Sequence, residues 1–218
     1  MHYRFKGVEI HSENAAKPAT DAAAYLVDWL RRRRRTYSAL DYGCGKLRYT
    51  RHLACRSEHI GVVDSEVQLR RTQRIFGQQT SIAKYVKCRW PFHTLQHLED
   101  FWTKSLRFYD FVLCANVLSA IPCPKARARS LRAIYAAVRR DGRVLFVNQH
   151  TNSYFTEVRK RPSTWPHLDG WVTTSSAGSF YYGVLNRYDT AALVSRFGFF
   201  AEETWINGQA NYVLARKI

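Results

Sequence analysis

Short apolar segments alternate with helix-like segments along most of this chain, and that alternation limits the folds it can adopt. Apolar runs at 37–41, 59–64, 109–118 and 143–148 are predicted as strands, and helical patterns separate most of them. Runs that are apolar almost throughout are typical of parallel strands covered on both faces. The sequence therefore predicts an α/β protein with a Rossmann-like, doubly wound, mostly parallel sheet and right-handed crossovers.

Other segments complete this scheme. Two extended runs, 199–206 and 209–216, flank Asn207-Gly208, and Asn-Gly between such runs predicts a hairpin and hence an antiparallel last strand. The 218 residues suit one domain over 1–218, with 1–36 as an N-terminal helical cover. The other expected elements are helices at 19–30, 46–55, 66–76 and 125–140, a strand at 82–88 and a helical connector at 91–105.

Residues 149–187 interrupt the alternation. The segment is rich in aromatic residues, with prolines and glycines between them. An irregular segment of this length inside a compact domain is usually functional, so we predict an inserted aromatic lid in which Tyr181 and Tyr182 contact substrate. The alternative is a small satellite core beneath a long loop.

Positive charge is the strongest signal in the composition. The formal net charge is +17, and an arginine run occupies 31–35. A field of this size attracts polyanions, so nucleic acid is one expected partner. A solvated basic surface without a polyanion partner is the alternative, and cations at the end of the predicted first helix need no ligand to explain them.

Membranes and structural metals are not expected. No apolar run approaches the roughly 18 to 20 residues that span a bilayer, and the polar N-terminus lacks a signal-peptide core, so a cytoplasmic location is expected. The five cysteines form no CxxC pair, so no metal site is predicted.

A glycine turn follows the first predicted strand, at Asp41-Tyr42-Gly43-Cys44-Gly45. Strand, glycine turn and helix together form a backbone cradle for a nucleotide-like ligand. Asp64 ends the next strand about 20 positions after Gly45, which is the spacing of an acid that binds ribose hydroxyls. A nicotinamide-binding turn requires a third glycine where this chain has Arg48, so that interpretation is disfavoured.

These residues resemble the class I S-adenosylmethionine-dependent methyltransferases over 37–148 and, more weakly, over 188–218. The turn, Asp64 and the segment Cys114-Ala115-Asn116-Val117-Leu118 carry the resemblance. It implies S-adenosylmethionine as cofactor and S-adenosylhomocysteine as product. The implied cofactor-binding residues are Asp41, Tyr42, Gly43, Cys44, Gly45, Asp64, Ser65, Arg89, Trp90, Cys114 and Asn116.

The chain departs from the family pattern in two places. Lys46-Leu47 stands where the family often has a third glycine. No acid follows the predicted third strand to hold the adenine amino group. We therefore expect Trp90 to stack on adenine while backbone groups at Arg89 serve its edge.

The reaction itself is less constrained. His150 lies just beyond the fifth predicted strand and is the candidate general base, with a plain loop histidine as the alternative. Asn116 is expected to line the cofactor or the acceptor, or else to cap its strand. The NPPY-type motif of nucleic-acid amine methyltransferases is absent, since Asn116-Val117-Leu118-Ser119 stands there.

Three functions stay open at this stage. The first is methyl transfer to N or O of a small-molecule acceptor. The second is methylation of RNA or DNA, for which the charge is the argument. The third is a non-catalytic protein that binds S-adenosylmethionine. The sequence makes no prediction of oligomeric state.

Overall fold

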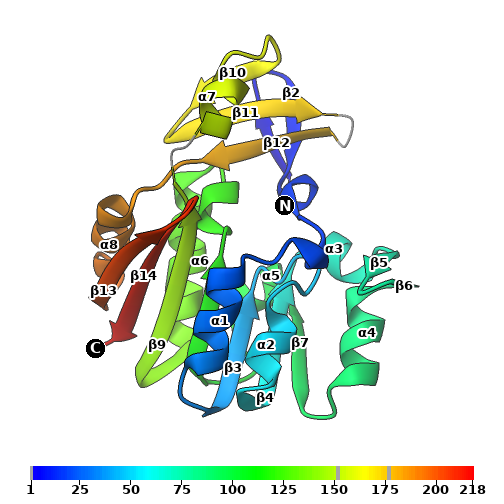
Figure 1. Ribbon diagram of the computed structural model, residues 1–218, viewed down its shortest axis with the longest axis vertical. Helices are drawn as coiled ribbons and strands as arrows, with labels where there is room; N and C mark the ends of the chain where they lie inside the picture. The colour runs from blue at the N-terminus through cyan, green and yellow to red at the C-terminus, as the bar shows by residue number, and fades with distance from the viewer. Residues whose placement is uncertain (1, 151–152, 176–177) are drawn as a thin grey trace.

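A computed structural model describes residues 2–150, 153–175 and 178–218. Its main body is a seven-stranded sheet in the order β13-β14-β9-β8-β3-β4-β7 (Figure 1). The five strands from β9 to β7 run parallel, whereas β14 is antiparallel to both of its neighbours. The strands of this sheet are β3 (Thr36–Tyr42), β4 (Ser57–Asp64), β7 (His93–His97), β8 (Tyr109–Ala115), β9 (Val138–Gln149), β13 (Phe199–Asn207) and β14 (Ala210–Lys217).

Helices cover both faces of this sheet because its strands are apolar on both sides. Leu40 of β3 packs into one core cluster and its neighbour Ala39 into the other, as the period-two alternation of a strand requires. One face is covered by α5 (Leu98–Thr103), α6 (Pro124–Ala137) and α8 (Arg187–Ser195), and the other by α1 (Ala24–Arg32), α2 (Thr50–Ala54) and α4 (Ile82–Arg89). The predicted doubly wound sheet and its antiparallel last strand are thereby confirmed.

The third strand was predicted in the wrong place. Residues 82–88 form most of helix α4, and the strand that follows β4 in the sheet is β7. Ile82 and Val86 are buried four positions apart on one helical face, and the Ser81 hydroxyl caps the helix by accepting a hydrogen bond from Lys84 N. The expected helical connector at 91–105 therefore contains β7 and α5.

A second sheet has the order β1-β2-β12-β11-β10 and lies beyond the carboxyl ends of the parallel strands (Figure 1). It pairs the N-terminal hairpin with a segment far along the chain, through parallel pairing of β12 with β2. Its strands are β1 (His2–Phe5), β2 (Val8–His11), β10 (Thr164–His167), β11 (Gly170–Ser175) and β12 (Gly178–Gly183), with helix α7 (Ser153–Arg159) beside them.

Two expectations are corrected by this sheet. The segment 149–187, expected to be irregular, contains helix α7 and the strands β10, β11 and β12, and 1–36 begins with strands rather than with a purely helical cover. The role of 149–187 as a lid stays a prediction. Both segments are polar or aromatic without clear alternation, so neither has a core-facing pattern that a local reading could detect. The remaining elements are β5 (Gln73–Ile75), β6 (Gln78–Thr80), α3 (Glu66–Arg70), and the short 3-10 helices η1 (Ser12–Ala15), η2 (Ala19–Asp21) and η3 (Leu118–Ala120).

A partly buried ion pair fastens the second sheet to helix α6 of the main body. Arg127 of α6 donates two hydrogen bonds to the carboxylate of Asp169, at 2.7 and 3.0 Å, and one to Ile121 O at 2.8 Å. The hydroxyl of Tyr181 donates to the same carboxylate at 2.6 Å. Tyr181 is therefore part of this anchor and not of a substrate surface.

We expect Asp169→Asn to destabilise the protein by about 2 to 3 kcal/mol, because removing one partner leaves a buried arginine without its countercharge. Urea unfolding measures the change. Glu157→Gln is the matched control, since its ion pair with Lys160 is exposed and is worth less than about 0.5 kcal/mol. Equal effects of the two substitutions would contradict the anchoring role.

Within the described ranges, no helix is both long enough and apolar enough to cross a bilayer.

Candidate cofactor site

The glycine turn after β3 has the backbone conformation that the sequence suggested. Gly43 has φ +72° and Gly45 has φ +55°, in the left-handed region that favours glycine. A Cβ on Gly43 would lie 2.3 Å from Val117 Cγ2. The turn is fixed to the neighbouring strand by a hydrogen bond from Gly43 N to Val63 O at 2.8 Å. No side chain fits at position 43, so the backbone itself forms this wall of the pocket.

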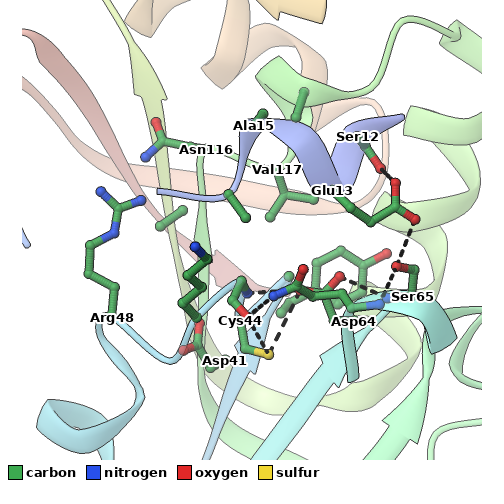
Figure 2. A pocket seen from close by; sticks show the side chains of 18 of the residues that line it. Ser12, Glu13, Ala15, Asp41, Cys44, Arg48, Asp64, Ser65, Asn116 and Val117 are labelled. Carbon is green, nitrogen blue, oxygen red and sulfur yellow. Dashed lines mark hydrogen bonds between the residues drawn. The ribbon is translucent and has the colours of Figure 1, made fainter. Parts of the chain in front are cut away.

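Asp64 lies at the carboxyl end of β4, beside the turn (Figure 2). Its two carboxylate oxygens accept hydrogen bonds from Gly45 N and Ser65 N, each at 2.8 Å. Burial raises the pKa of Asp64 to about 6, although these two N–H groups act in the opposite direction. The carboxylate is therefore held in a fixed orientation at the pocket floor, where it can accept hydrogen bonds from ligand hydroxyls.

Asp41, at the end of β3, is the second buried carboxyl of the site. It accepts a hydrogen bond from the Thr50 hydroxyl at 2.5 Å. Burial raises the pKa of Asp41 to about 7; the Thr50 hydrogen bond opposes the rise and the charge of Asp64 adds to it. A cationic ligand group near Asp41 would favour its ionised form.

We expect Asp41 to make the cofactor-free protein less stable as the pH rises from about 4 to about 7. Its folded-state pKa lies above the value of about 3.9 in an unfolded chain, so the folded protein binds this proton more tightly in that window. The effect is about 4 kcal/mol at most. Urea unfolding at about pH 5 and about pH 7.5 should show Asp41→Asn gaining stability relative to wild type at the higher pH. A difference that does not change with pH would contradict the raised pKa.

The N-terminal segment closes the pocket from above, which the sequence did not reveal. Helix η1 crosses over the turn, and the Glu13 carboxylate reaches the β4–α3 junction (Figure 2). Glu13 Oε1 accepts a hydrogen bond from the Ser65 hydroxyl at 2.9 Å, and Arg71 donates to Glu13 O at 3.3 Å. Glu13 is 7% exposed in the structure. Burial of a glutamate cannot be recognised from the sequence, so its role in covering the pocket was missed.

Two further lining residues were also missed. Leu98 follows β7 directly and lines the pocket, at the place where the expected third-strand residues would have been. Gln68 of α3 is fully buried and donates from Nε2 to Gly45 O. In the described part of the chain its Oε1 is buried with no hydrogen-bond partner, so an acceptor beside the turn is left unsatisfied.

A second cavity, of about 490 Å³, adjoins this pocket. The two share Asn116 and Arg48, together with Ala15, Lys17 and Tyr49. Asn116 has φ +60°, a conformation that costs energy for a residue with a side chain, and its N–H donates to Val147 O at 2.7 Å. This hydrogen bond places Asn116 where the two cavities meet.

The structure brings most of the predicted cofactor residues together. The pocket is lined by Asp41, Tyr42, Gly43, Cys44, Gly45, Asp64, Ser65 and Asn116. Cys114 is buried in β8 and is not among the lining residues. Arg89 and Trp90 end helix α4 and precede β7, so they lie at the amino ends of the parallel strands, away from the pocket at the carboxyl ends. The adenine contacts expected from them are therefore corrected. That expectation depended on the misplaced third strand.

The expected acceptor residues are divided. Tyr182 lines the second cavity, whereas Tyr181, its neighbour in β12, points to the opposite face and joins the anchor to Arg127. The backbone N–H of His150 donates a hydrogen bond to Gln209 O at 2.9 Å. His150 lines neither of the two cavities. Its role as a base stays an untested prediction.

Comparisons with known proteins agree with this arrangement. The model of a family described as a methyltransferase domain matches residues 11–198. An uncharacterized protein of Escherichia coli (strain K12), YmfD, is 36% identical over 213 residues, which cover 98% of this chain and 95% of that relative.

Two solved structures share the fold. The 1,6-didemethyltoxoflavin-N1-methyltransferase of Burkholderia thailandensis, with bound 1,6-didemethyltoxoflavin and S-adenosylhomocysteine, is 16% identical with a TM-score of 0.60, covering 94% of this chain and 78% of its own. The N-methyltransferase NodS of Bradyrhizobium japonicum WM9, in complex with S-adenosylhomocysteine, is 14% identical with a TM-score of 0.58, covering 88% and 84%.

Fold and turn together define a Rossmann-like protein of the class I methyltransferase type. The match over 11–198 shows that the chain belongs to the methyltransferase domain family. The resemblance seen in the sequence is thereby confirmed.

Proposed function

We propose that this protein transfers the methyl group of S-adenosylmethionine to N or O of a small-molecule acceptor. The second cavity carries the proposal, because it adjoins the cofactor pocket at Asn116 and measures about 490 Å³. Pockets of this size bind small organic molecules rather than polymers. Methyltransferases of the same fold that hold S-adenosylhomocysteine support the choice of cofactor.

The residues of the first pocket fit this cofactor. Asp64 presents an oriented carboxylate for the ribose hydroxyls, and Asp41 lies where an ammonium group would find a countercharge. The unpartnered Gln68 Oε1 offers a further acceptor. The cofactor supplies a sulfonium-activated methyl group, so the chain has only to position acceptor and methyl carbon in line and to exclude water. Glu13 and η1 supply part of that exclusion.

The position of the arginine run at 31–35 favours a small acceptor over nucleic acid, although Lys17, Lys46 and Arg48 line the cofactor pocket itself. The arginine run at 31–35 ends α1 and precedes β3, and is thus at the amino ends of the parallel strands. The pocket lies at their carboxyl ends, beside Asp41 and Asp64. A nucleic-acid substrate bound to this run would be remote from the methyl group. Methylation of nucleic acid and a non-catalytic role are therefore the two alternatives that the experiment below must distinguish from the proposal.

Calorimetry with S-adenosylmethionine, followed by release of S-adenosylhomocysteine on addition of a small-molecule extract, tests the proposal. We expect binding and turnover with the extract but not with random RNA or DNA. Turnover only with nucleic acid, and binding to it that weakens steeply with salt, would favour the polyanion alternative. Cofactor binding without turnover on any acceptor would favour a non-catalytic protein. The single domain over 1–218 and the cytoplasmic location stay predictions.

A further inference from the structure

The walls of the second cavity are unusually rich in tyrosine. Tyr212 is 1% exposed, stacks on Trp205 with ring centroids 5.1 Å apart, and meets Tyr25 edge-on at 5.4 Å. Tyr49 and Tyr182 also line the cavity. Tyr25, which is 38% exposed, and the half-buried Tyr182 present ring surface to the cavity, which suits a planar ligand.

Arg48 supplies a cationic group at the junction with the cofactor pocket. Its guanidinium lies over the Tyr49 ring at 5.1 Å and donates one hydrogen bond, to Asp21 O at 3.2 Å. Among the described residues, Arg48 has no carboxylate within ion-pair distance. A guanidinium has five N–H donors, so most of those on Arg48 are available to a ligand. Figure 2 shows Arg48 and the Asn116 amide on the same side of the pocket.

Groups able to remove a proton are scarce in this cavity. Of the described lining residues none is a histidine, and the one carboxylate is the exposed Asp21. Burial raises the pKa of Tyr212 to about 12, so its hydroxyl stays protonated at neutral pH and cannot act as the base. An acceptor that must lose a proton during the reaction would find little help here.

We propose that the second cavity takes a planar, anionic acceptor whose charge is held by Arg48, and that this acceptor attacks the methyl group already deprotonated. The inference rests on the proposed function. An electron pair of the anionic oxygen or nitrogen forms the new bond to the methyl carbon. The carbon–sulfur bond breaks with its electron pair left on sulfur, so S-adenosylhomocysteine leaves as a neutral thioether, the methylated product is uncharged, and no proton is released.

Binding of ring probes to the protein tests this proposal without relying on turnover. The probes are 4-nitrophenol above its pKa, neutral 4-nitroanisole and cationic 4-nitrobenzylamine, each titrated against protein with and without S-adenosylhomocysteine. We expect the phenolate to bind about 10-fold tighter than the other two, and Arg48→Gln to remove that preference, because a charge-assisted hydrogen bond is worth roughly that factor. Arg35→Gln, an exposed residue at the other end of the strands, is the matched control and should leave binding unchanged.

Several results would overturn the proposal. One is equal or tighter binding of the neutral or cationic probe, and another is the absence of binding by all three. A third is an Arg48→Gln variant that loses affinity for S-adenosylhomocysteine while keeping the phenolate preference, since Arg48 would then serve the cofactor. Failure of S-adenosylhomocysteine to bind wild type would instead refute the proposed function, and the cofactor-free titrations would still report on the acceptor.

Discussion

Replacing Gly43 with alanine should reduce the affinity for S-adenosylhomocysteine by about 100-fold or more. Two causes combine. The φ of +72° costs an alanine about 1 kcal/mol, and its Cβ would meet Val117 Cγ2 at 2.3 Å, well inside van der Waals contact. Because the turn is tied to β4 by the Gly43 N–H, relief of the contact requires a shift of the turn or of Val117, and both line the cofactor pocket. Calorimetry on the purified variant measures the loss.

Two companion variants separate these causes. Gly77→Ala places a Cβ at φ +85° with nothing within 4 Å, remote from the pocket, so it should cost a similar stability and leave the cofactor affinity unchanged. Combining Gly43→Ala with Val117→Ala removes the methyl group that the new Cβ strikes, and should restore part of the affinity. If the double variant binds no better than Gly43→Ala, contact with Val117 is not the reason for the loss.

Replacing Asp64 with asparagine should weaken cofactor binding by about 10- to 100-fold at neutral pH, since hydrogen bonds to a charged acceptor are worth about 1.5 to 3 kcal/mol. Asparagine has the same shape, so the backbone around Gly45 should persist. The amide, however, offers one oxygen where the carboxylate offers two, and Ser65 N or Gly45 N loses its acceptor. Asp28→Asn, which removes an exposed helix-surface carboxylate paired with Arg32, is the control and should not change the affinity.

The same substitution predicts a change in pH dependence. The ionised form of Asp64 can accept hydrogen bonds both from the backbone N–H groups of Gly45 and Ser65 and from the cofactor hydroxyls. The pKa of Asp64 is about 6 in the cofactor-free protein. The affinity of wild type for S-adenosylhomocysteine should therefore fall as the pH drops through about 6, whereas this component should be absent in Asp64→Asn. Parallel pH profiles for the two proteins would show that Asp64 does not titrate in the binding step.

Local patterns were sufficient for the elements with a strong and continuous signal. The strand β8 was placed from the sequence because a continuous apolar run is typical of a strand buried on both faces. The hairpin between β13 and β14 was placed because Asn-Gly between two extended runs is a local turn signal. Strand β7 was missed because His93-Thr94-Leu95-Gln96-His97 is mostly polar. It lies at the sheet edge with one neighbour, β4, where an apolar run is not required.

The sequence by itself determined the glycine turn, the acid at Asp64 and the sheet that holds them, since each depends on residues close together in the chain. Only the tertiary structure decided what covers the turn. The pairing of β2 with β12 joins segments more than 160 residues apart, and it leads the chain from β2 directly into η1 and Glu13 above the pocket. Pairing between segments so far apart produces no hydrophobic periodicity within either segment from which it could be predicted. The same holds for the second cavity, whose tyrosines come from four separate segments.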